Sequence, residues 1–161
     1  MNESGGYSPK DLHFGKDGQS KLISGITKLS KAVKSTLGPM GNTVLIESPN
    51  HTHGITVTKD GVTVAKSIQL LDPVENLAVQ MMKEAADRTA SEAGDGTTTA
   101  IVLTEALVKK GVELIGPKDN KTEILRELVS LSEGVIKKLS SQARPVTDKK
   151  LLDVATISSN N

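Results

Sequence analysis

The sequence contains no cysteine and no tryptophan, and Tyr7 and Phe14 are its only tyrosine and phenylalanine. Without cysteine, the chain has no disulfide framework, no Cys-ligated zinc, no iron–sulfur centre and no thiol nucleophile. With so few aromatic rings, it also lacks the usual platforms for base stacking. The core is therefore expected to be aliphatic, and a chain of 161 residues is long enough to bury one.

Excess charge of one sign and long apolar runs are also missing. Twenty Lys and Arg residues face nineteen Asp and Glu residues, which leaves a formal net charge of +1. This balance argues against binding to nucleic acid through neutralisation of phosphates. No run approaches the ~18 consecutive apolar residues of a membrane span, and the first residues contain no apolar signal-peptide region. We expect a soluble, cytoplasmic protein with no nucleic-acid partner and no membrane partner.

The first part of the chain predicts an arm followed by a helix. Residues 1–10 are rich in Gly, Ser and Pro and poor in apolar residues, which is typical of a disordered N-terminal arm. Apolar residues then recur at the spacing of one helical face, at Leu22, Ile26, Leu29, Val33 and Leu37. The helix is expected to end at Leu37, because Gly38 favours a left-handed cap and Pro39 cannot continue a helix.

A β-hairpin is predicted next, over about Thr43–Thr58. Residues 43–46 are β-branched and apolar, residues 55–58 alternate, and turn formers separate the two. The following segment, 61–71, fits two structures. Its valines alternate as in a strand, whereas Asp60 could cap a short helix.

The rest of the chain reads as helical, so the fold class is mostly α with one β-hairpin. Asp72 and Pro73 have the residue types that begin a helix. Segment 97–115 is apolar on nearly all sides, which predicts a buried central helix. Two further helices are expected to begin at Thr122 and at Asp148.

The most informative motif leads into the predicted central helix. Its glycines permit sharp turns, and the first amides of the helix have no intrahelical acceptor, so an anion such as phosphate would satisfy them. Three hydroxyls add further donors. A carboxylate beside a phosphate requires a hard cation such as Mg²⁺ between them. These roles point to Asp95, Gly96, Thr97, Thr98 and Thr99.

A simpler explanation for the same motif is a Gly-Asp turn in which Asp95 is the helix N-cap and no ligand is needed. Three consecutive threonines argue against it, because β-branched residues are mediocre helix formers. The motif is not a Walker A loop, since no lysine follows the glycines.

Two shorter stretches carry weaker signals. The first, residues 36–41, contains two glycines after a helix, and by itself is a helix stop. The second offers a cation, Lys59, and a second carboxylate, Asp60, although a capped turn explains it equally well. His51 and His53 lie in the predicted hairpin loop with no third ligand in view, which favours solvent-exposed histidines.

The order of these motifs closely resembles the start of a GroEL-type (group I) chaperonin subunit. The motifs are Thr-Leu-Gly-Pro-Met-Gly at 36–41, Thr-Lys-Asp-Gly at 58–61, Gly-Asp-Gly-Thr-Thr-Thr at 94–99 and Thr-Ile-Ser at 156–158. The resemblance runs from about Leu12 to Asn161. It implies that residues 11–161 are the N-terminal half of an equatorial domain, a mostly helical domain that binds ATP and makes ring contacts.

The resemblance also implies roles for individual residues. Asp60 is implied to be catalytic, near the attacked phosphate, and Asp95 to hold Mg²⁺. The hairpin is implied to pair with the termini of a neighbouring subunit. The residues implied to contact the nucleotide are Thr36, Leu37, Gly38 and Pro39, with Lys59 beside the phosphates and Gly96, Thr97, Thr98 and Thr99 cradling them.

Several parts of a family subunit are absent from these 161 residues. They are the intermediate domain with its catalytic carboxylate, the apical domain that binds unfolded clients and the co-chaperonin, and the second equatorial half. Turnover of ATP by this chain alone is therefore not expected.

Two interpretations remain. In the first, the chain is part of an ATP-dependent chaperonin subunit that assists protein folding in a homo-oligomeric ring. In the second, it is a short, stand-alone chaperonin-derived interaction module without ATPase activity. The apolar period of 151–157 still continues where the sequence stops, which favours the first.

Overall fold

The computed structural model describes residues 10–47 and 54–158. The predicted arm, except for Lys10, and the hairpin loop with His51 and His53 lie outside these residues. The chain divides after Leu114 into two compact units. The elements in chain order are α1 Gly15–Lys34, β1 Val44–Glu47, β2 Ile55–Thr58, α2 Gly61–Ser67, α3 Pro73–Ala93, α4 Thr97–Leu114, α5 Lys121–Gln142 and α6 Asp148–Ser158.

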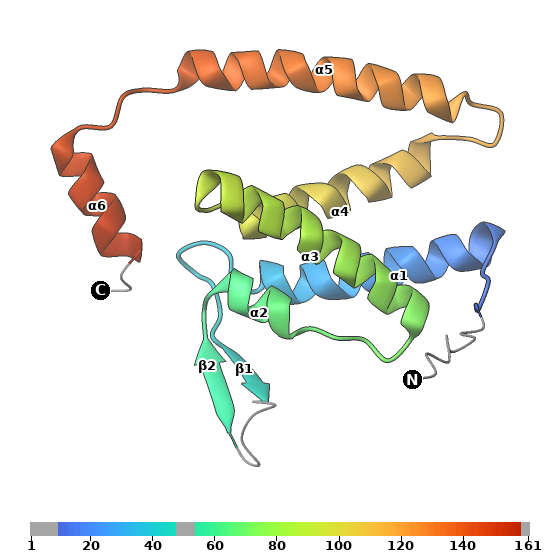
Figure 1. The fold of residues 1–161 in the computed structure, drawn as a ribbon, viewed down its shortest axis with the longest axis horizontal. Coiled ribbons are helices and arrows are strands. Elements are labelled where there is room, and N and C mark those ends of the chain that lie inside the picture. The colour runs from blue at the N-terminus through green and yellow to red at the C-terminus, as the bar shows by residue number, and fades with distance from the viewer. Residues whose placement is uncertain (1–9, 48–53, 159–161) are drawn as a thin grey trace, which may run out of the picture. The chain divides into compact units, whose positions relative to one another are not determined.

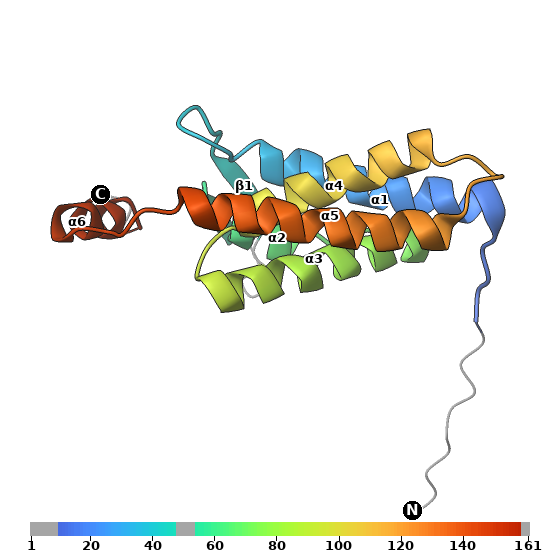
Figure 2. The same ribbon diagram turned by 90° about the horizontal axis from the view of Figure 1, so that it is seen from above.

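The first unit is built on three helices, α1, α3 and α4, which pack on one another (Figures 1 and 2). Helix α2 contacts α1 and α4, and the hairpin extends from the same unit (Figure 1). The core is aliphatic, as the sequence predicts. Its buried members are Ile26, Leu29, Val33, Val64, Ala65, Ala78, Val79, Met82, Ala86 and Ile101.

The backbone of helix α1 lies in close contact with the backbone at the start of α3. A Cβ on Gly25 would lie 2.2 Å from the carbonyl oxygen of Glu75, so only glycine fits there without a shift. The Glu75 carboxylate accepts hydrogen bonds from Ser24 Oγ (2.7 Å) and Lys28 Nζ (2.5 Å). Lys21 Nζ donates to Asp72 Oδ2 (2.9 Å). Polar side chains of α1 therefore hold the first turn of α3.

Asp72 is expected to make the unit more sensitive to acid. It caps α3 by accepting from the amides of Val74 (2.9 Å) and Glu75 (3.1 Å). The hydrogen bond from Lys21, helped by these amides, lowers the pKa of Asp72 from 3.8 to about 2. A folded-state pKa below the unfolded value means that the stabilisation is present above about pH 4 and is lost as the pH falls towards 2.

Thermal unfolding of the wild type and of Asp72→Asn, followed by circular dichroism between pH 7 and pH 2, measures this effect. The wild type is expected to have the higher midpoint at neutral pH, and the difference between the two proteins is expected to shrink between about pH 4 and pH 2. A difference that stays constant across this range would show that the Asp72 carboxylate does not contribute through its charge.

Helix α1 ends at Lys34, three residues before the predicted end at Leu37. The chain tightens there, because the amides of Thr36 and Leu37 bond to the carbonyls of Val33 (3.1 Å) and Lys34 (3.2 Å), three residues back. Gly38 then adopts a positive φ of 77°. The prediction placed the end too late, and segment 36–39 is a turn outside the helix.

Segment 61–71 begins as helix rather than strand, because Asp60 is the N-cap of α2. The two strands of the predicted hairpin pair antiparallel, with Val44 opposite Thr58 and Glu47 opposite Ile55. Helix α3 begins at Pro73 with Asp72 as its cap, as predicted. Local capping chemistry therefore accounts for the start of both helices.

Helix α4 begins at Thr97 as predicted, but it is not buried on nearly all sides. Its buried residues are Thr97, Ile101 and Glu105, which share one face, whereas Leu103 and Leu107 are exposed. In its own unit, α1, α2 and α3 pack against α4. That expectation was wrong, because an apolar composition alone does not tell which sides of a helix find partners.

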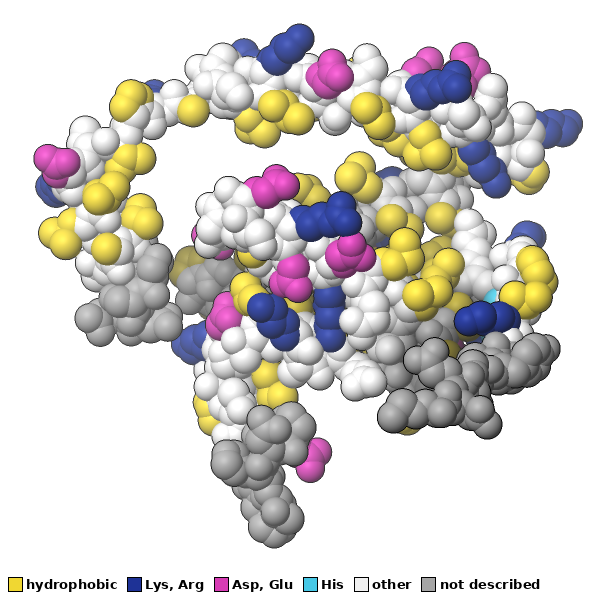
Figure 3. Space-filling model, viewed as in Figure 1, with side chains coloured by type: hydrophobic (Ala, Val, Ile, Leu, Met, Phe, Trp, Pro, Cys, Tyr) yellow, Lys and Arg dark blue, Asp and Glu magenta, His cyan; other side chains and the backbone are white. Residues whose placement is uncertain are grey.

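The second unit contains α5 and α6. Helix α5 begins at Lys121, one residue before the predicted start, because Asn120 caps it by accepting from the amide of Glu123 (3.3 Å). Helix α6 begins at Asp148, as predicted. Hydrophobic side chains form a row along one side of α5 (Figure 3). Among the helices that the structure describes, none is long and apolar enough to cross a membrane.

Candidate functional site

The three sequence motifs meet in the first unit. Gly61, the first residue of α2, is buried. A Cβ built on it would lie 2.2 Å from Oγ1 of Thr98 and 3.2 Å from Oγ1 of Thr36. The turn after α1, the start of α2 and the start of α4 are therefore in direct contact. The motifs were predicted to act as a set, and the structure brings Thr36, Gly61 and Thr98 together.

The start of α4 has the features of an anion site. Gly96 has a positive φ of 101°, and the first intrahelical bond runs from the Ala100 amide to the Gly96 carbonyl (2.8 Å). The amides of residues 97–99 consequently have no intrahelical acceptor. Thr97 is only 3% exposed, and its Oγ1 has no hydrogen-bond partner within the described residues. A buried, unpaired hydroxyl at a helix N-terminus fits a ligand with acceptor oxygens.

Asp95 is exposed and does not act as the N-cap of α4. Its Oδ1 accepts from the amide of the adjacent Gly96 (2.6 Å), whereas an N-cap carboxylate bonds the second or third amide of the helix. Gly96 holds the N-cap position and has no side chain. The interpretation of Asp95 as a helix cap is therefore wrong, and its second oxygen stays available to a cation.

A cation at Asp95 would have to draw on ligands outside the protein. No group of three or more His, Asp or Glu residues that could hold a metal occurs in residues 10–47 and 54–158. Mg²⁺ commonly binds one or two carboxylates and completes its shell with water and substrate phosphates. One exposed carboxylate beside free helix amides fits that donor set.

Asp60 is held in place by the helix that it caps. Its Oδ1 accepts from the Val62 amide (3.2 Å), and its Oδ2 accepts from the amide (2.9 Å) and the hydroxyl (2.6 Å) of Thr63. Partial burial by itself would raise the pKa of Asp60, but the hydrogen bonds from Thr63 and Val62 outweigh it, and the pKa is lowered. Asp60 is therefore an ionised carboxylate in a defined orientation, and Lys59 is exposed beside it in sequence.

Segment 36–41 forms a compact turn. The amide of Gly41 bonds the carbonyl of Gly38 (2.9 Å), and the amide of Asn42 reaches back to the carbonyl of Ser35 (2.7 Å). A Cβ on Gly41 would lie 2.2 Å from the carbonyl oxygen of Thr36. The two glycines let the chain close on itself in a turn whose Thr36 lies near Gly61 at the start of α2.

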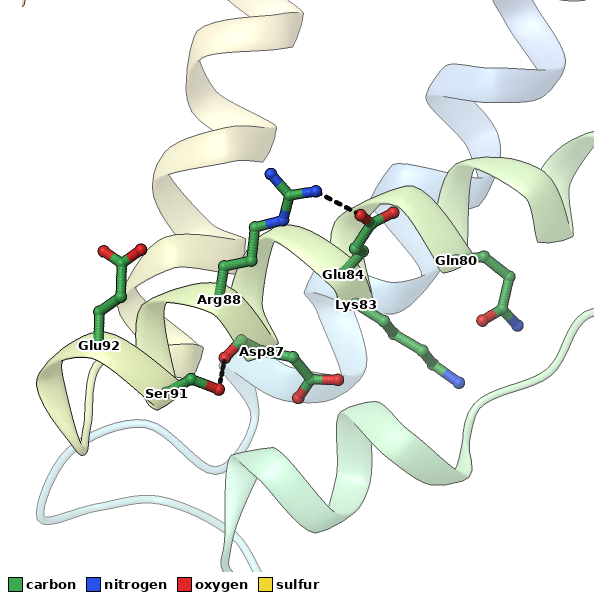
Figure 4. A pocket seen from close by; sticks show the side chains of 7 residues that line it. All are labelled: Gln80, Lys83, Glu84, Asp87, Arg88, Ser91 and Glu92. Atoms are coloured by element: carbon green, nitrogen blue, oxygen red, sulfur yellow. Dashed lines mark hydrogen bonds and ion pairs between the residues drawn. The ribbon is translucent and has the colours of Figure 1, made fainter.

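A hollow of about 570 Å³ lies along α3, and none of the residues that line it belongs to the three motifs (Figure 4). Several of its side chains bond one another or the backbone. Arg88 pairs with Glu84 (2.6 Å), Ser91 Oγ donates to the carbonyl of Asp87 (2.8 Å), and Lys83 Nζ donates to the carbonyl of Ile68 (2.6 Å). Because Arg88, Glu84 and Lys83 already have partners, this hollow is a weaker candidate than the start of α4.

Glu105 was not predicted from the sequence as a residue of interest. It lies on the buried face of α4, at the i+8 position from Thr97, and pairs with Lys34 and Lys109. The sequence did contain a signal for its burial, because Glu105 follows Thr97 and Ile101 at a spacing of four residues and has apolar neighbours. Its partner Lys34 is far away in the sequence and could not be identified from it.

Comparisons with known proteins show similarity to chaperonins. The model of the TCP-1/cpn60 chaperonin family matches residues 29–161. Two crystal structures of the chaperonin gp146 from the bacteriophage EL 2 (Pseudomonas aeruginosa), obtained in the presence of ATP-BeFx, are similar to the chain. Crystal form II is 38% identical with a TM-score of 0.77, over 91% of this chain and 26% of that chain. Crystal form I is 38% identical with a TM-score of 0.70, over 82% and 23%. The chain thus spans about a quarter of the length of these structures.

Proposed function

Because the chain belongs to the TCP-1/cpn60 chaperonin family, we propose that it supplies the phosphate and Mg²⁺ part of the nucleotide site of an ATP-dependent chaperonin subunit. One observation carries the proposal. Thr36, Gly61 and Thr98 converge at the start of α4, and the first residue of that helix, Thr97, has a buried hydroxyl with no partner among the described residues. The chaperonin gp146 was crystallised in the presence of ATP-BeFx, which supports a nucleotide ligand for this fold.

The first turn of α4 is proposed to bind the phosphates. The amides of Thr97, Thr98 and Thr99 and the positive end of the helix dipole favour an anion there. Gly96, whose amide already donates to Asp95 Oδ1, is proposed to line the phosphates with its backbone. The threonine hydroxyls add donors, and Lys59 adds a positive charge that strengthens hydrogen bonds to phosphate oxygens. Because Gly61 has no side chain, α2 approaches Thr98 closely at the start of α4.

Asp95 is the residue proposed to hold Mg²⁺. When bound, Mg²⁺ neutralises negative charge on the phosphates. One carboxylate oxygen of Asp95 accepts from the Gly96 amide, and the other is free to bind the ion. Residues 36–39, which are Thr36, Leu37, Gly38 and Pro39, are proposed to line the nucleotide from the opposite side.

Asp60 is proposed as the catalytic group near the attacked phosphate. With its pKa lowered, its carboxylate is a weak base at neutral pH. Its proposed role is therefore to accept a hydrogen bond from the attacking water and to orient it, rather than to store a proton. The capping bonds from Val62 and Thr63 hold the carboxylate in position for that role.

The proposed setting is a homo-oligomeric ring of chaperonin subunits in the cytoplasm, in which ATP binding assists protein folding. The hairpin β1–β2, with the exposed apolar side chains of Leu45, Ile55 and Val57, is proposed to pair with a neighbouring subunit. Unfolded clients and a co-chaperonin would contact other parts of such a subunit.

Titration of the ¹⁵N-labelled chain with MgATP, followed by NMR, tests the proposal. Shifted amides are expected in segments 36–39, 59–61 and 95–100. The dissociation constant is expected on the order of 1 mM, because the chain spans about a quarter of its solved relatives. AMP with Mg²⁺ is the control, since AMP lacks the β- and γ-phosphates and is expected to leave 95–100 unshifted.

Two outcomes would contradict the proposal. The absence of shifts at 95–100 at several millimolar MgATP would remove the phosphate site, and the stand-alone interaction module without ATPase activity would then be favoured. Micromolar binding to a verified monomer would show instead that this chain holds a complete nucleotide site.

A further inference from the structure

Glu105 is the one charged side chain that is buried among the residues that the structure describes. It lies in the middle of α4, on the face that packs against the rest of the first unit. A buried carboxylate is costly unless it is paired and hydrogen-bonded. The role proposed above for the phosphate site makes no use of it, so its presence needs another explanation.

Two lysines share this carboxylate. Lys34 Nζ pairs with Oε2, and Lys109 Nζ pairs with Oε1 at 2.7 Å. Burial by itself would raise the pKa of Glu105, but the hydrogen bonds from Lys109 and Lys34 outweigh it and lower the pKa. Both lysine side chains remain more than 40% exposed. The carboxylate is thus ionised, and each of its oxygens has one partner.

Stability alone is a poor reason for this arrangement. The cost of desolvating a buried ion pair offsets much of its attraction, and an apolar side chain of similar size is often as stable. An ion pair does add direction, because the carboxylate is satisfied only where the ammonium group can reach it. Since Lys34 belongs to α1 and Glu105 to α4, their contact fixes where one helix lies along the other.

The two partners are close in sequence to the two walls of the phosphate site. Lys34 is the last residue of α1, two positions before Thr36. Glu105 lies seven residues after Thr98 on the same rigid helix, roughly 10 Å along its axis. The hydroxyls of Thr36 and Thr98 both lie close to Gly61. A slide of α1 along α4 would therefore change the spacing of these two threonines directly.

We propose that Glu105 is a positioning residue of the phosphate site. Through Lys34, it sets where the turn after α1, and with it Thr36, lies against Thr98 and the first amides of α4. Lys109 supplies the second oxygen of Glu105 with a partner from the same helix, so that the carboxylate stays in one orientation. This inference rests on the proposed function for the ligand, although the geometry that it describes is independent of that function.

Two substitutions test the role of the pair. Glu105→Met keeps a side chain of similar length without the charge. Lys34→Met removes the inter-helix contact and leaves Glu105 paired with Lys109, so no buried charge is left alone. Both variants are expected to keep the thermal midpoint within a few degrees of the wild type. Both are also expected to displace the NMR amide signals of 35–41 and 97–99 and to weaken MgATP binding about tenfold.

Each variant has a matched control. Glu113→Gln breaks an exposed ion pair with Lys110 (2.7 Å) on the same helix as Glu105. Lys31→Met removes an exposed positive charge from α1, one turn before Lys34, without touching Glu105. Both controls are expected to leave the amide signals of 35–41 and 97–99 in place and the MgATP affinity within about twofold of the wild type.

The readouts separate the possible failures. Unchanged signals at 35–41 and 97–99 in a folded Lys34→Met protein would overturn the positioning role, whatever the effect on stability. If the wild type does not bind MgATP, the proposed function fails, whereas the amide signals still decide whether Glu105 positions the turn. If Glu105→Met does not fold, the amide signals of 35–41 and 97–99 in Lys34→Met decide whether the pair positions the turn. Equal effects of Lys31→Met and Lys34→Met would reduce the role of Lys34 to its charge and would also overturn the proposal.

Discussion

Asp95→Ala is expected to abolish the Mg²⁺-dependent part of nucleotide binding while the helices stay folded. Asp95 is exposed, and the one contact of its side chain within the described residues is with the adjacent Gly96 amide (2.6 Å). Its removal therefore leaves no cavity and no buried unpaired group, and a change in unfolding free energy within about 0.5 kcal/mol is expected. The MgATP shifts at 95–100 are expected to fall to those seen with ATP and EDTA.

Asp119→Ala is the matched control for this prediction. Asp119 is also exposed, and it accepts from a nearby glycine amide, that of Gly116, at 2.7 Å. It lies outside the three motifs, so its removal is expected to leave the MgATP titration unchanged. If Asp95→Ala instead unfolded the first unit and left binding intact, Asp95 would be a structural residue and the metal assignment would be wrong.

Gly25→Ala is expected to destabilise the first unit by about 3 kcal/mol. The new Cβ would lie 2.2 Å from the carbonyl oxygen of Glu75 and 2.9 Å from its Cα. These are backbone atoms of α3, so they cannot move aside as a flexible side chain can. The two helices must separate, which also strains the bonds from Ser24 and Lys28 to Glu75. Urea unfolding, followed by circular dichroism, measures the loss.

Gly134→Ala provides the control for this effect. Gly134 is an exposed residue in the interior of α5, and a Cβ there would meet no atom within 4 Å. Alanine is the better helix former by about 1 kcal/mol, so this variant is expected to be slightly more stable than the wild type. If Gly25→Ala were also neutral or stabilising, α1 and α3 would not be in backbone contact at this position.

Much of the candidate site could be predicted from the sequence, because its residues lie in short motifs. The turn and helix start at 94–99 depend on residues only a few positions apart, and so does the cap that Asp60 forms on α2. Their joint placement was inferred from resemblance to a family, not from the motifs themselves. Glu105 and the contact of Gly61 with Thr36 and Thr98 were not predicted, since each joins segments far apart in the chain.

Local chemistry is sufficient for most of the elements of this protein. The 3.6-residue period, the caps at Asp72 and Asp60 and the alternation around the hairpin each act within about one turn, so the sequence contains them completely. The buried sides of the helices depend on partners elsewhere in the chain, as in Lys21 with Asp72 and Lys34 with Glu105, which are 51 and 71 residues apart. For that reason tertiary packing alone decided that α4 leaves Leu103 and Leu107 exposed and that Gly25 admits the backbone of α3.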